Sequence, residues 1–389
     1  MAQTFEYAVV GLGALGSATA WQLARRGERV LGLERFALGH ERGASHDSSR
    51  IIRHSYHTPG YVRLTLETFE DWATLEGETG ERFVTVTGGV DLFPPGAAIS
   101  PVDYMASMDA IGVPYQVLDN DAVADRWPQL SLPAGTTTLH QARTGIVPAA
   151  RAVASMQRRA AAHGAVLREE SPVTAVRDLG PGGLQVEAGG TTYRVRRLVV
   201  TADAWTNDVL GHVGWTLPLT VTQEQVTYFR PDDAARFGPD RFPVWIWMDD
   251  PSFYGFPTFG EPTVKAAQDC GGPVVSGDER SFDPDPRRVA LLADFMARTF
   301  PGSGPVQRSK TCLYTLTPDR DFVLGPVPGH ESVIVGLGAA HGFKFAPTFG
   351  RLLADLAVSG SAPTHLDLTP FRLDRPSLTS ADHPASWLV

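Results

Sequence analysis

The sequence predicts a mixed α/β (α+β) fold, in which a Rossmann-like domain is interleaved with an antiparallel-sheet domain. Three observations predict it. A strand, a glycine-rich turn and a helix open the chain within residues 7–26. Short β-rich segments separated by turns fill much of residues 222–267. A buried-type strand at 333–338, a glycine-containing turn and a helix then return to the α/β pattern.

The first forty residues contain the elements of a βαβ unit in the expected order. A β-prone run, Tyr7–Val10, ends at a GxGxxG turn at residues 11–16. A helix is expected over Ser17–Arg26, because apolar residues recur there at helical spacing. A second strand, Arg29–Leu33, follows with Glu34 at its tip. This order is the context that a dinucleotide fingerprint requires.

Each residue of the fingerprint has a physical role. Gly11 allows the tight turn, and Gly13 lets the backbone approach a pyrophosphate at the helix N-terminus. Gly16 permits close packing of helix on strand, and Glu34 would accept hydrogen bonds from a ribose. Isolated glycine-rich turns are common, but this one lies between a strand and a helix. We therefore expect a bound dinucleotide, although the motif alone does not separate FAD from NAD.

The remaining elements alternate between helices and strands. A polar segment, residues 39–49, comes first, and a loop of that length is more often functional than idle. Helices are expected at 61–75, 105–111, 149–163, 289–300 and 349–358. Strands are expected at 83–93, 115–118, 166–167, 173–176, 184–187, 192–195, 198–201, 222–229, 244–248, 253–256, 263–267 and 333–338. The Rossmann-like domain would take residues 1–85, 145–218 and 320–389, and the antiparallel-sheet domain 86–144 and 219–319.

Composition excludes several classes of protein. The 389 residues carry 34 basic and 43 acidic side chains, a net charge of −9, which argues against nucleic-acid binding through a basic surface. No apolar run approaches the roughly 18–20 residues of a membrane span. The N-terminus lacks a secretory pattern and Ser386–Val389 lack a peroxisomal signal, so a cytoplasmic location is expected. Two cysteines, Cys270 and Cys312, exclude a disulfide framework and a cysteine-based zinc site, and no metal is expected.

Lysine is rare in this chain. Of the 34 basic residues, 31 are arginine, and the lysines are Lys265, Lys310 and Lys344. One interpretation of the excess of arginine is codon usage in a G+C-rich genome. Where lysine persists, the position can instead require an ammonium group rather than a guanidinium.

Four segments together carry a family resemblance that runs nearly end to end. They are the βαβ unit, the segment His46-Asp47-Ser48-Ser49-Arg50-Ile51-Ile52-Arg53, the segment Tyr254-Gly255-Phe256-Pro257 with Lys265 downstream, and Lys310-Thr311-Cys312-Leu313-Tyr314-Thr315 with His341-Gly342-Phe343-Lys344 downstream. In these the chain resembles the monomeric sarcosine oxidase family. That family includes N-methyltryptophan oxidases and related flavin-dependent amino- and imino-acid oxidases of the D-amino-acid oxidase superfamily.

The resemblance implies FAD, held by the Rossmann-like domain and joined covalently through Cys312. From the residues alone, Cys312 is equally consistent with a small buried hydrophobe, and nearby Lys310 would help to lower its pKa. Cys270 is interpreted as structural. Arg50 resembles an arginine that packs over the flavin ring. The residues expected to bind the cofactor are Gly11, Gly13, Gly16, Glu34, Ser49, Arg50, Val173, Cys312, Gly342 and Lys344.

The resemblance also implies a substrate site. Arg53 and Lys344 resemble a pair that clamps the substrate carboxylate, and two cations on one carboxylate would fix its orientation. From spacing alone, two arginines three residues apart, such as Arg50 and Arg53, more often lie on a solvated helix face, although apolar Ile51 and Ile52 argue somewhat against this. Tyr254 and Tyr314 resemble residues that line the cavity, although most such aromatic residues are core. The sequence does not decide whether Trp245 or Trp247 lines it.

Lys265 resembles the lysine with which relatives activate dioxygen, where a cation stabilises the superoxide anion. Members that oxidise sarcosine carry histidine four residues later, whereas this chain has Asp269. On a strand the two positions share a face, so Lys265 and Asp269 are expected to be close. Asp269 would either hold the lysine charged or meet the nitrogen of a substrate other than sarcosine. A second departure, Asp203, replaces a glycine usual in such enzymes, and the sequence offers no account of it beyond turn geometry.

The resemblance therefore implies a monomeric, FAD-dependent oxidase of a secondary amino acid or cyclic imino acid. Hydride would pass to FAD, and O2 would reoxidise it to give H2O2. Two alternatives stay open: an FAD-dependent dehydrogenase with another electron acceptor, and an NAD-dependent dehydrogenase or nucleotide-binding regulatory module. Neither nucleic acid nor membrane is an expected partner. The expected catalytic residues are Lys265, Asp269, Arg53, Lys344, Tyr254 and Tyr314.

Overall fold

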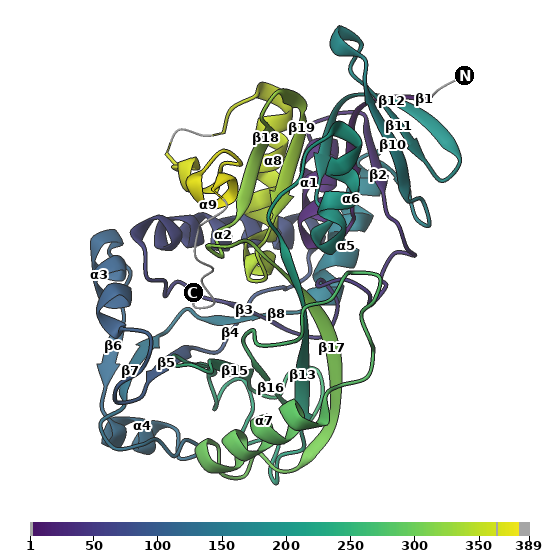
Figure 1. Ribbon diagram of the computed structural model, residues 1–389. Coiled ribbons are helices and arrows are strands. Elements are labelled where there is room, and N and C mark those ends of the chain that lie inside the picture. The colour runs from purple at the N-terminus through teal and green to yellow at the C-terminus, as the bar shows by residue number, and fades with distance from the viewer. Residues whose placement is uncertain (1–2, 363–364, 381–389) are drawn as a thin grey trace.

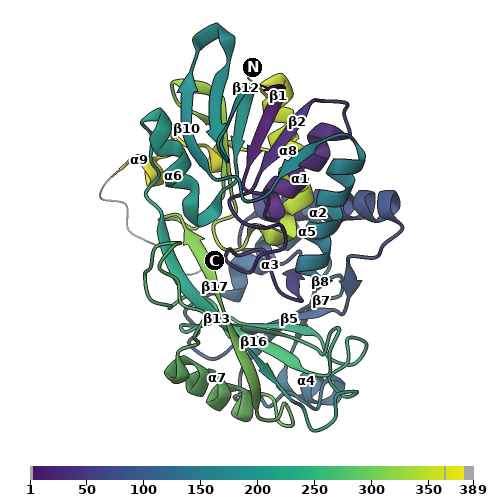
Figure 2. The same ribbon diagram turned by 90° about the vertical axis from the view of Figure 1, so that its right-hand side faces the viewer.

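The computed structural model describes residues 3–362 and 365–380 (Figure 1). Residues 386–389, where no peroxisomal signal is expected, lie outside this range. Two eight-stranded sheets and one three-stranded sheet form the described fold. The first large sheet occupies the upper half of Figures 1 and 2, and the second occupies the lower half. The mixed α/β fold class is confirmed.

The first sheet is built around five parallel strands, with antiparallel strands added at its edges. Its strands are β1 (Gln3–Val10), β2 (Val30–Leu33), β9 (Val166–Arg168), β10 (Val173–Asp178), β11 (Leu184–Ala188), β12 (Thr191–Val200), β18 (Val323–Val327) and β19 (His330–Leu337). Side chains alternate between its faces. Along β1, Tyr7 and Val9 belong to one apolar cluster, and Ala8 and Val10 belong to another. Both faces are therefore buried, as parallel sheets require.

Helices cover this sheet on both faces. The covering helices are α1 (Ala14–Ala24), α5 (Ala149–Ala162), α6 (Thr206–Leu210) and α8 (Ala346–Ser359). Helix α2 (Pro59–Thr79) packs against α8 and α5, and α9 (Pro376–Thr379) lies in the C-terminal segment. The α1 and α8 helices approach closely because residue 350 is glycine: a Cβ atom there would lie 2.5 Å from the Cβ of Ala18. The short 3₁₀ turns are Gly180–Gly182, Asp203–Trp205, Gly211–Val213, Gly342–Phe345 and Thr369–Phe371.

The second sheet has the strand order β17-β13-β16-β15-β14-β5-β7-β6. Its strands are β5 (Gly89–Phe93), β6 (Gln116–Leu118), β7 (Thr137–Gln141), β13 (Thr220–Phe229), β14 (Val244–Trp247), β15 (Phe253–Phe256), β16 (Val264–Gln268) and β17 (Val306–Leu316). All its pairs are antiparallel except β5 with β14, where the two chain segments that build the sheet meet. The helices beside it are α3 (Pro101–Ile111), α4 (Asn120–Arg126) and α7 (Pro286–Thr299).

A small sheet of β3 (Arg50–Ile52), β8 (Gly145–Val147) and β4 (Thr85–Val86) lies between the two large sheets (Figure 1). It fixes the backbone of Arg50. No described helix is long and apolar enough to cross a membrane.

Most predicted element types are confirmed, and the exceptions have local causes. The segments 192–195 and 198–201 form one strand, β12, because Arg197 continues the pairing with Tyr7 of β1. The strand expected over 83–93 is divided into β4 and β5 at Gly88, whose φ is 69°. Four elements, β7, β17, β18 and α4, are not predicted from the sequence. Their segments contain polar residues or proline, which obscure the apolar periodicity on which the prediction depends. The domain boundaries stay a prediction.

Candidate active site

A cavity of about 580 Å³ lies where the carboxyl ends of β1, β2, β12 and β19 face the second sheet. Ligands of open α/β sheets bind at this edge. The wall includes the glycine-rich turn, the end of the polar loop at residues 43–46, and side chains from β14, β15 and β17. The cavity is therefore bounded by both large sheets.

The glycine-rich turn leaves no room for side chains. Gly11 has a φ of 86°, and a Cβ atom there would lie 2.6 Å from the Thr201 carbonyl oxygen. At Gly16, a Cβ atom would lie 1.8 Å from the Gly11 carbonyl oxygen. Gly13 caps α1 without a side chain, and the Ala14 amide donates to Ser45 Oγ at 2.9 Å. The positive end of α1 thus meets the cavity, where a pyrophosphate would be stabilised.

Glu34 lies at the end of β2 on the cavity wall and is buried. Its carboxylate accepts hydrogen bonds from the amides of Leu12 at 2.8 Å and Phe36 at 3.1 Å, and His40 lies 3.4 Å away. Burial alone would raise the pKa of Glu34, but hydrogen bonds from His40 and the two amides outweigh burial and lower the pKa. An ionised carboxylate at this position suits a ribose diol.

His46 and Arg50 also line the cavity. Both ring nitrogens of His46 are buried and have no hydrogen-bond partner within the described part of the chain. Burial lowers the pKa of His46 to about 3, so its imidazole is neutral. Arg50 donates to the carbonyl oxygens of Ala44 at 2.7 Å and Ser49 at 2.8 Å, which fixes its guanidinium. An orphaned imidazole beside a fixed planar cation suits a polar ring system such as that of a flavin.

Cys312, on β17, faces the same cavity and is buried as a free thiol. Burial raises the pKa of this thiol to about 11. The cations that oppose this shift are Arg50, Lys265 and Arg280. Lys310, expected to act on this thiol, instead pairs with Glu41 at 3.2 Å. The other cysteine, Cys270, is also buried but does not belong to the cavity wall.

Besides Arg35 and Arg50, three more basic side chains lie on the cavity wall, and they are Arg53, Arg320 and Lys344. Arg53 pairs with buried Asp91, with 3.3 Å between Nη1 and Oδ1. Lys344 Nζ donates to the carbonyl oxygen of His341 at 2.8 Å. Burial, together with Arg53, lowers the pKa of Lys344 well below its usual value. A bound carboxylate would oppose that shift, so the cluster suits an anionic group.

Asp269 contacts Arg320 rather than Lys265, so the expected Lys265–Asp269 contact is wrong. Arg320 Nη1 lies 3.0 Å from Asp269 Oδ2, and the side chains are 1% and 25% exposed, respectively. The physical reason is that β16 ends at Gln268, so the strand alternation stops before Asp269. Cys270 then has a φ of 62°, which turns the chain. The Asp269 residue itself belongs to the cavity wall.

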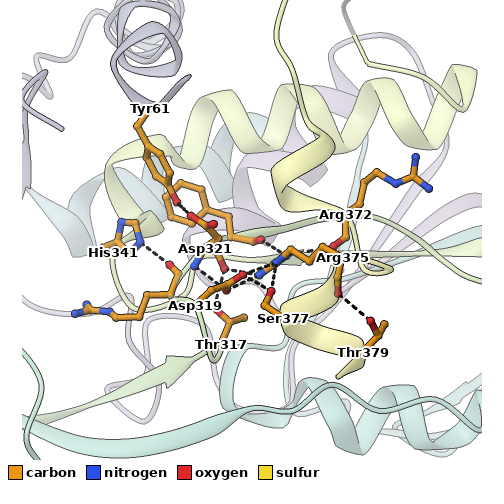
Figure 3. Close-up of polar contacts among 11 residues, drawn as sticks. Tyr61, Thr317, Asp319, Asp321, His341, Arg372, Arg375, Ser377 and Thr379 are labelled. Atoms are coloured by element: carbon orange, nitrogen blue, oxygen red, sulfur yellow. Dashed lines mark hydrogen bonds and ion pairs between the residues drawn. The ribbon is translucent and has the colours of Figure 1, made fainter. Parts of the chain in front are cut away.

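The turn after β17 that carries Arg320 is held by the C-terminal segment (Figure 3). Arg375 makes a two-point ion pair with Asp319, at 2.8 Å and 2.9 Å, and donates to the carbonyl oxygen of Asp321 at 3.0 Å. Arg320 has a φ of 58°, and its carbonyl oxygen lies 2.9 Å from Nε2 of His341. These contacts fix the backbone from which Arg320 reaches Asp269.

Lys265, on β16, is buried and does not belong to the described cavity wall. Its Nζ lies 2.7 Å from Asp47 Oδ2 and donates to the Ser49 carbonyl oxygen at 3.0 Å. Asp47 in turn accepts a hydrogen bond from the Tyr228 hydroxyl at 2.5 Å. Burial lowers the pKa of Lys265 to about 8, although Asp47 opposes the shift.

Two tyrosines contribute to the cavity from β15 and β17. The hydroxyls of Tyr254 and Tyr314 lie 3.2 Å apart, and both residues belong to the wall. Burial raises both pKa values, so both phenols stay neutral. Ile246 lines the cavity, whereas Trp245 and Trp247 pack in the apolar cluster beneath α7.

Comparison with known proteins agrees with this geometry. Residues 6–356 match the family described as FAD dependent oxidoreductase. The chain belongs to this family. It is 34% identical to a monomeric sarcosine oxidase of Streptomyces avermitilis, over 93% of this chain and 95% of that protein. It is 32% identical to a human peroxisomal sarcosine oxidase, over 96% and 97% of the two chains. NikD, an unusual amino acid oxidase solved in its open form, matches with a TM-score of 0.84 at 29% identity, over 95% and 97% of the chains.

Most residues predicted to act in this FAD-dependent oxidoreductase meet at one cavity. The predicted residues on the wall are Gly11, Gly13, Glu34, Arg50, Arg53, Val173, Tyr254, Asp269, Cys312, Tyr314, Gly342 and Lys344. Gly16, Ser49 and Lys265 do not belong to it. The glycine-rich turn, Glu34 and the orphaned His46 fit FAD, while the individual roles stay predictions.

The sequence prediction missed several polar residues of this oxidoreductase. Arg320 and His341 line the cavity, and Asp47 supports Lys265. Asp47 and His341 lie within segments that carry the resemblance, but no spacing rule reveals their contacts. Asp203 also lies on the wall, has a φ of 48°, and burial raises its pKa to about 6.

Proposed function

We propose that this protein oxidises a secondary amino acid or a cyclic imino acid, with FAD attached through Cys312, O2 as the acceptor and H2O2 as the product. The observation that carries the proposal is one cavity that combines a dinucleotide turn, Cys312, and a cationic cluster beside Asp269. The relatives, which are sarcosine oxidases and an amino acid oxidase, support the same reaction class.

The cavity residues account for substrate binding. Arg53 and Lys344 hold the carboxylate, because two cations at fixed positions orient an anion. Carboxylate binding favours the ammonium form of Lys344, whose pKa is lowered by burial. Asp269, oriented by Arg320, accepts a hydrogen bond from the substrate nitrogen. A bound FAD would supply the acceptor for hydride and the route of the electrons to dioxygen, while these residues orient the carbon next to that nitrogen.

Lys265 is proposed to stabilise the negative charge that develops on dioxygen. The alternative is an FAD-dependent dehydrogenase with a non-oxygen acceptor. One observation favours it: the Lys265 ammonium is paired with Asp47 and does not belong to the cavity wall.

Separate measurement of the two half-reactions tests the proposal. N-methyl amino acids, proline, pipecolate and cyclic imines are screened for anaerobic bleaching of the flavin, and the reduced enzyme is then mixed with O2 in a stopped-flow instrument. We expect stoichiometric peroxide. Lys265→Met should slow reoxidation about tenfold or more while anaerobic reduction changes less than about twofold. Reaction with a dye but not with O2 would establish the dehydrogenase, and equal loss in both half-reactions would remove Lys265 from the oxygen step.

We also propose a monomer located in the cytoplasm. Several relatives are named monomeric sarcosine oxidases, and the net charge of −9 disfavours nucleic-acid and anionic membrane surfaces. Light scattering of the purified holoenzyme checks the oligomeric state, and cell fractionation checks the location.

A further inference from the structure

The segment between β2 and β3 presents a carboxylate to the one lysine of β16. Asp47 has a φ of 83°, a left-handed conformation that is uncommon for a residue other than glycine. Its backbone carbonyl accepts a hydrogen bond from the Ala150 amide at 3.1 Å, and its Oδ1 accepts one from Tyr228. Backbone strain of this kind persists only where surrounding contacts fix it. The fixed position places Oδ2 2.7 Å from Lys265 Nζ.

The ammonium of Lys265 is surrounded by protein partners. Besides Asp47, the carbonyl oxygen of Ser49 lies at 3.0 Å and its hydroxyl at 3.3 Å. The ammonium thus donates two hydrogen bonds to Ser49 and forms an ion pair with Asp47. The side chains of Lys265 and Asp47 are only 4% and 5% exposed. Water therefore contributes little to stabilising the charge on either group.

The surroundings would favour a neutral lysine without Asp47. Burial is the largest influence on the pKa of Lys265 and lowers it, and the positive charge of Arg50 acts in the same direction. Asp47 is the main opposing influence. Conversely, burial alone would raise the pKa of Asp47, but Lys265, together with Tyr228 and Arg50, holds this pKa far below its usual value. The other titratable or charged groups that face this pair are Tyr228, Cys312, Arg308 and His46.

We propose that Asp47 is a positioning residue that keeps the buried Lys265 ammonium charged and fixed beside the flavin cavity, so that the oxygen reaction continues above neutral pH. The proposal rests on the oxygen role given to Lys265 above. Tyr228 supports Asp47 by donating to its second oxygen. Asp47 itself need not touch substrate, FAD or O2.

Asp47→Asn removes the charge and keeps the size of the side chain. In the wild type, the rate of reoxidation by O2 should decline as pH rises through about 8, where Lys265 loses its proton. In Asp47→Asn the decline should move at least about one pH unit lower, which makes reoxidation about tenfold slower at pH 9. The rates at pH 6 and the anaerobic reduction rates should agree with the wild type within about twofold. Tyr228→Phe should move the decline in the same direction by a smaller amount.

Thermal unfolding from pH 3 to 8 gives a readout that does not depend on turnover. Asp47→Asn should lower the melting temperature at pH 7. It should also reduce the fall in melting temperature on acidification, because the stabilisation from Asp47, whose pKa is lowered in the folded protein, is lost as pH decreases. Asp71→Asn is the matched control, since it removes a buried carboxylate that pairs with Arg351 in another part of the fold. This control should lose stability without moving the pH profile of reoxidation.

The outcomes separate the two proposals. If the wild type reoxidises with O2 but Asp47→Asn and Tyr228→Phe show an unchanged profile, the role of Asp47 is overturned. Faster reoxidation of Asp47→Asn at every pH also overturns it, because Asp47 would then suppress the lysine. If Asp47→Asn does not fold, the Tyr228→Phe variant decides the matter: an unchanged pH profile of reoxidation in Tyr228→Phe then overturns the role of Asp47. If the wild type does not react with O2 at all, the oxidase proposal fails first, and the role of Asp47 with it.

Discussion

At the scale of single residues, the two cysteines differ in their surroundings more than in their burial. Both thiols are buried, and burial raises the pKa of Cys312 to about 11. Only Cys312 lies on the cavity wall, and Arg50 is the first of the cations that favour its thiolate. The proposed attachment of a flavin would therefore depend on the cations around Cys312, because a thiolate is the nucleophile in such chemistry.

Cys312→Ser should abolish covalent attachment while leaving the glycine-rich turn able to bind FAD. After acid precipitation, we expect a yellow pellet from the wild type and a colourless pellet from Cys312→Ser. Cys270→Ser is the control and should stay yellow, because Cys270 does not belong to the cavity wall. A colourless wild-type pellet would refute covalent attachment, and a yellow Cys312→Ser pellet would place it elsewhere.

The Asp269–Arg320 pair is expected to contribute both to the stability of the fold and to turnover, and two variants measure these contributions separately. Asp269→Asn removes the negative charge that lies 3.0 Å from a nearly fully buried guanidinium, so we expect a loss of about 1–3 kcal/mol in the free energy of unfolding. The value lies below that of fully buried pairs because Asp269 is 25% exposed. Removing both partners, as Asp269→Asn with Arg320→Met, should recover part of this stability.

Turnover of this double variant should not recover together with its stability. If Asp269 contacts the substrate nitrogen, kcat/KM of both variants should be at least about tenfold below the wild type. Urea unfolding and steady-state kinetics on the same preparations measure both quantities. Normal turnover in the double variant would show that the pair serves only packing.

At the scale of elements, local patterns predict the βαβ unit well and long-range contacts poorly. The glycine-rich turn needs only residues 11–16 and their neighbours, so its strand and helix follow from spacing. By contrast, Arg320 meets Asp269 across 51 residues, and Lys265 meets Asp47 between β16 and the polar loop. Strand alternation wrongly paired Lys265 with Asp269, because it assumed that β16 continues past Gln268. Which side chains meet depends on where strands end, and periodicity places those ends poorly.

The turn between β17 and β18 gives an element-scale prediction. Arg375 joins this turn to the C-terminal segment by two contacts to Asp319, and both side chains are largely buried (Figure 3). Arg375→Ala should lower the free energy of unfolding by about 2–4 kcal/mol, because it removes the cation that pairs with Asp319 and the donor to the carbonyl oxygen of Phe322. It should also raise KM, since the same turn aims Arg320 into the cavity.

The neighbouring Arg372 gives a matched control for that variant. Arg372 pairs with Asp374, but the two side chains are 60% and 49% exposed. Exposed ion pairs of this kind contribute little to stability, because water screens their charges, so Arg372→Ala should change neither stability nor KM measurably. Equal effects of both alanine variants would mean that the whole C-terminal segment, rather than the Arg375 contact, supports the turn.

At the scale of the whole molecule, buried histidines make the fold sensitive to mild acid. Burial lowers the pKa of His46 to about 3 and the pKa values of His54 and His140 to about 4. Each stays neutral in the folded chain but binds a proton near pH 6.5 when unfolded. The stability that they contribute is therefore present above pH 6.5 and is lost as pH falls toward 4. Asp203, whose pKa is raised to about 6, has the opposite effect on stability: it makes the fold more stable as pH falls from 6 to 4. It therefore offsets the loss caused by one histidine over that range.

Urea unfolding at pH 7.5, 6.0 and 5.0 should therefore show a steady loss of stability, with each histidine contributing up to about 1.4 kcal/mol per pH unit below 6.5. His54→Gln should reduce this slope by the contribution of one histidine, because glutamine can still bond to Thr65, which lies 2.7 Å from the imidazole, but takes no proton. The exposed His212 supplies the control, and His212→Gln should leave the slope unchanged. A stability that stays constant from pH 7.5 to 5.0 would show that the buried histidines take up protons without unfolding, and that the interior around them rearranges to accept the charge.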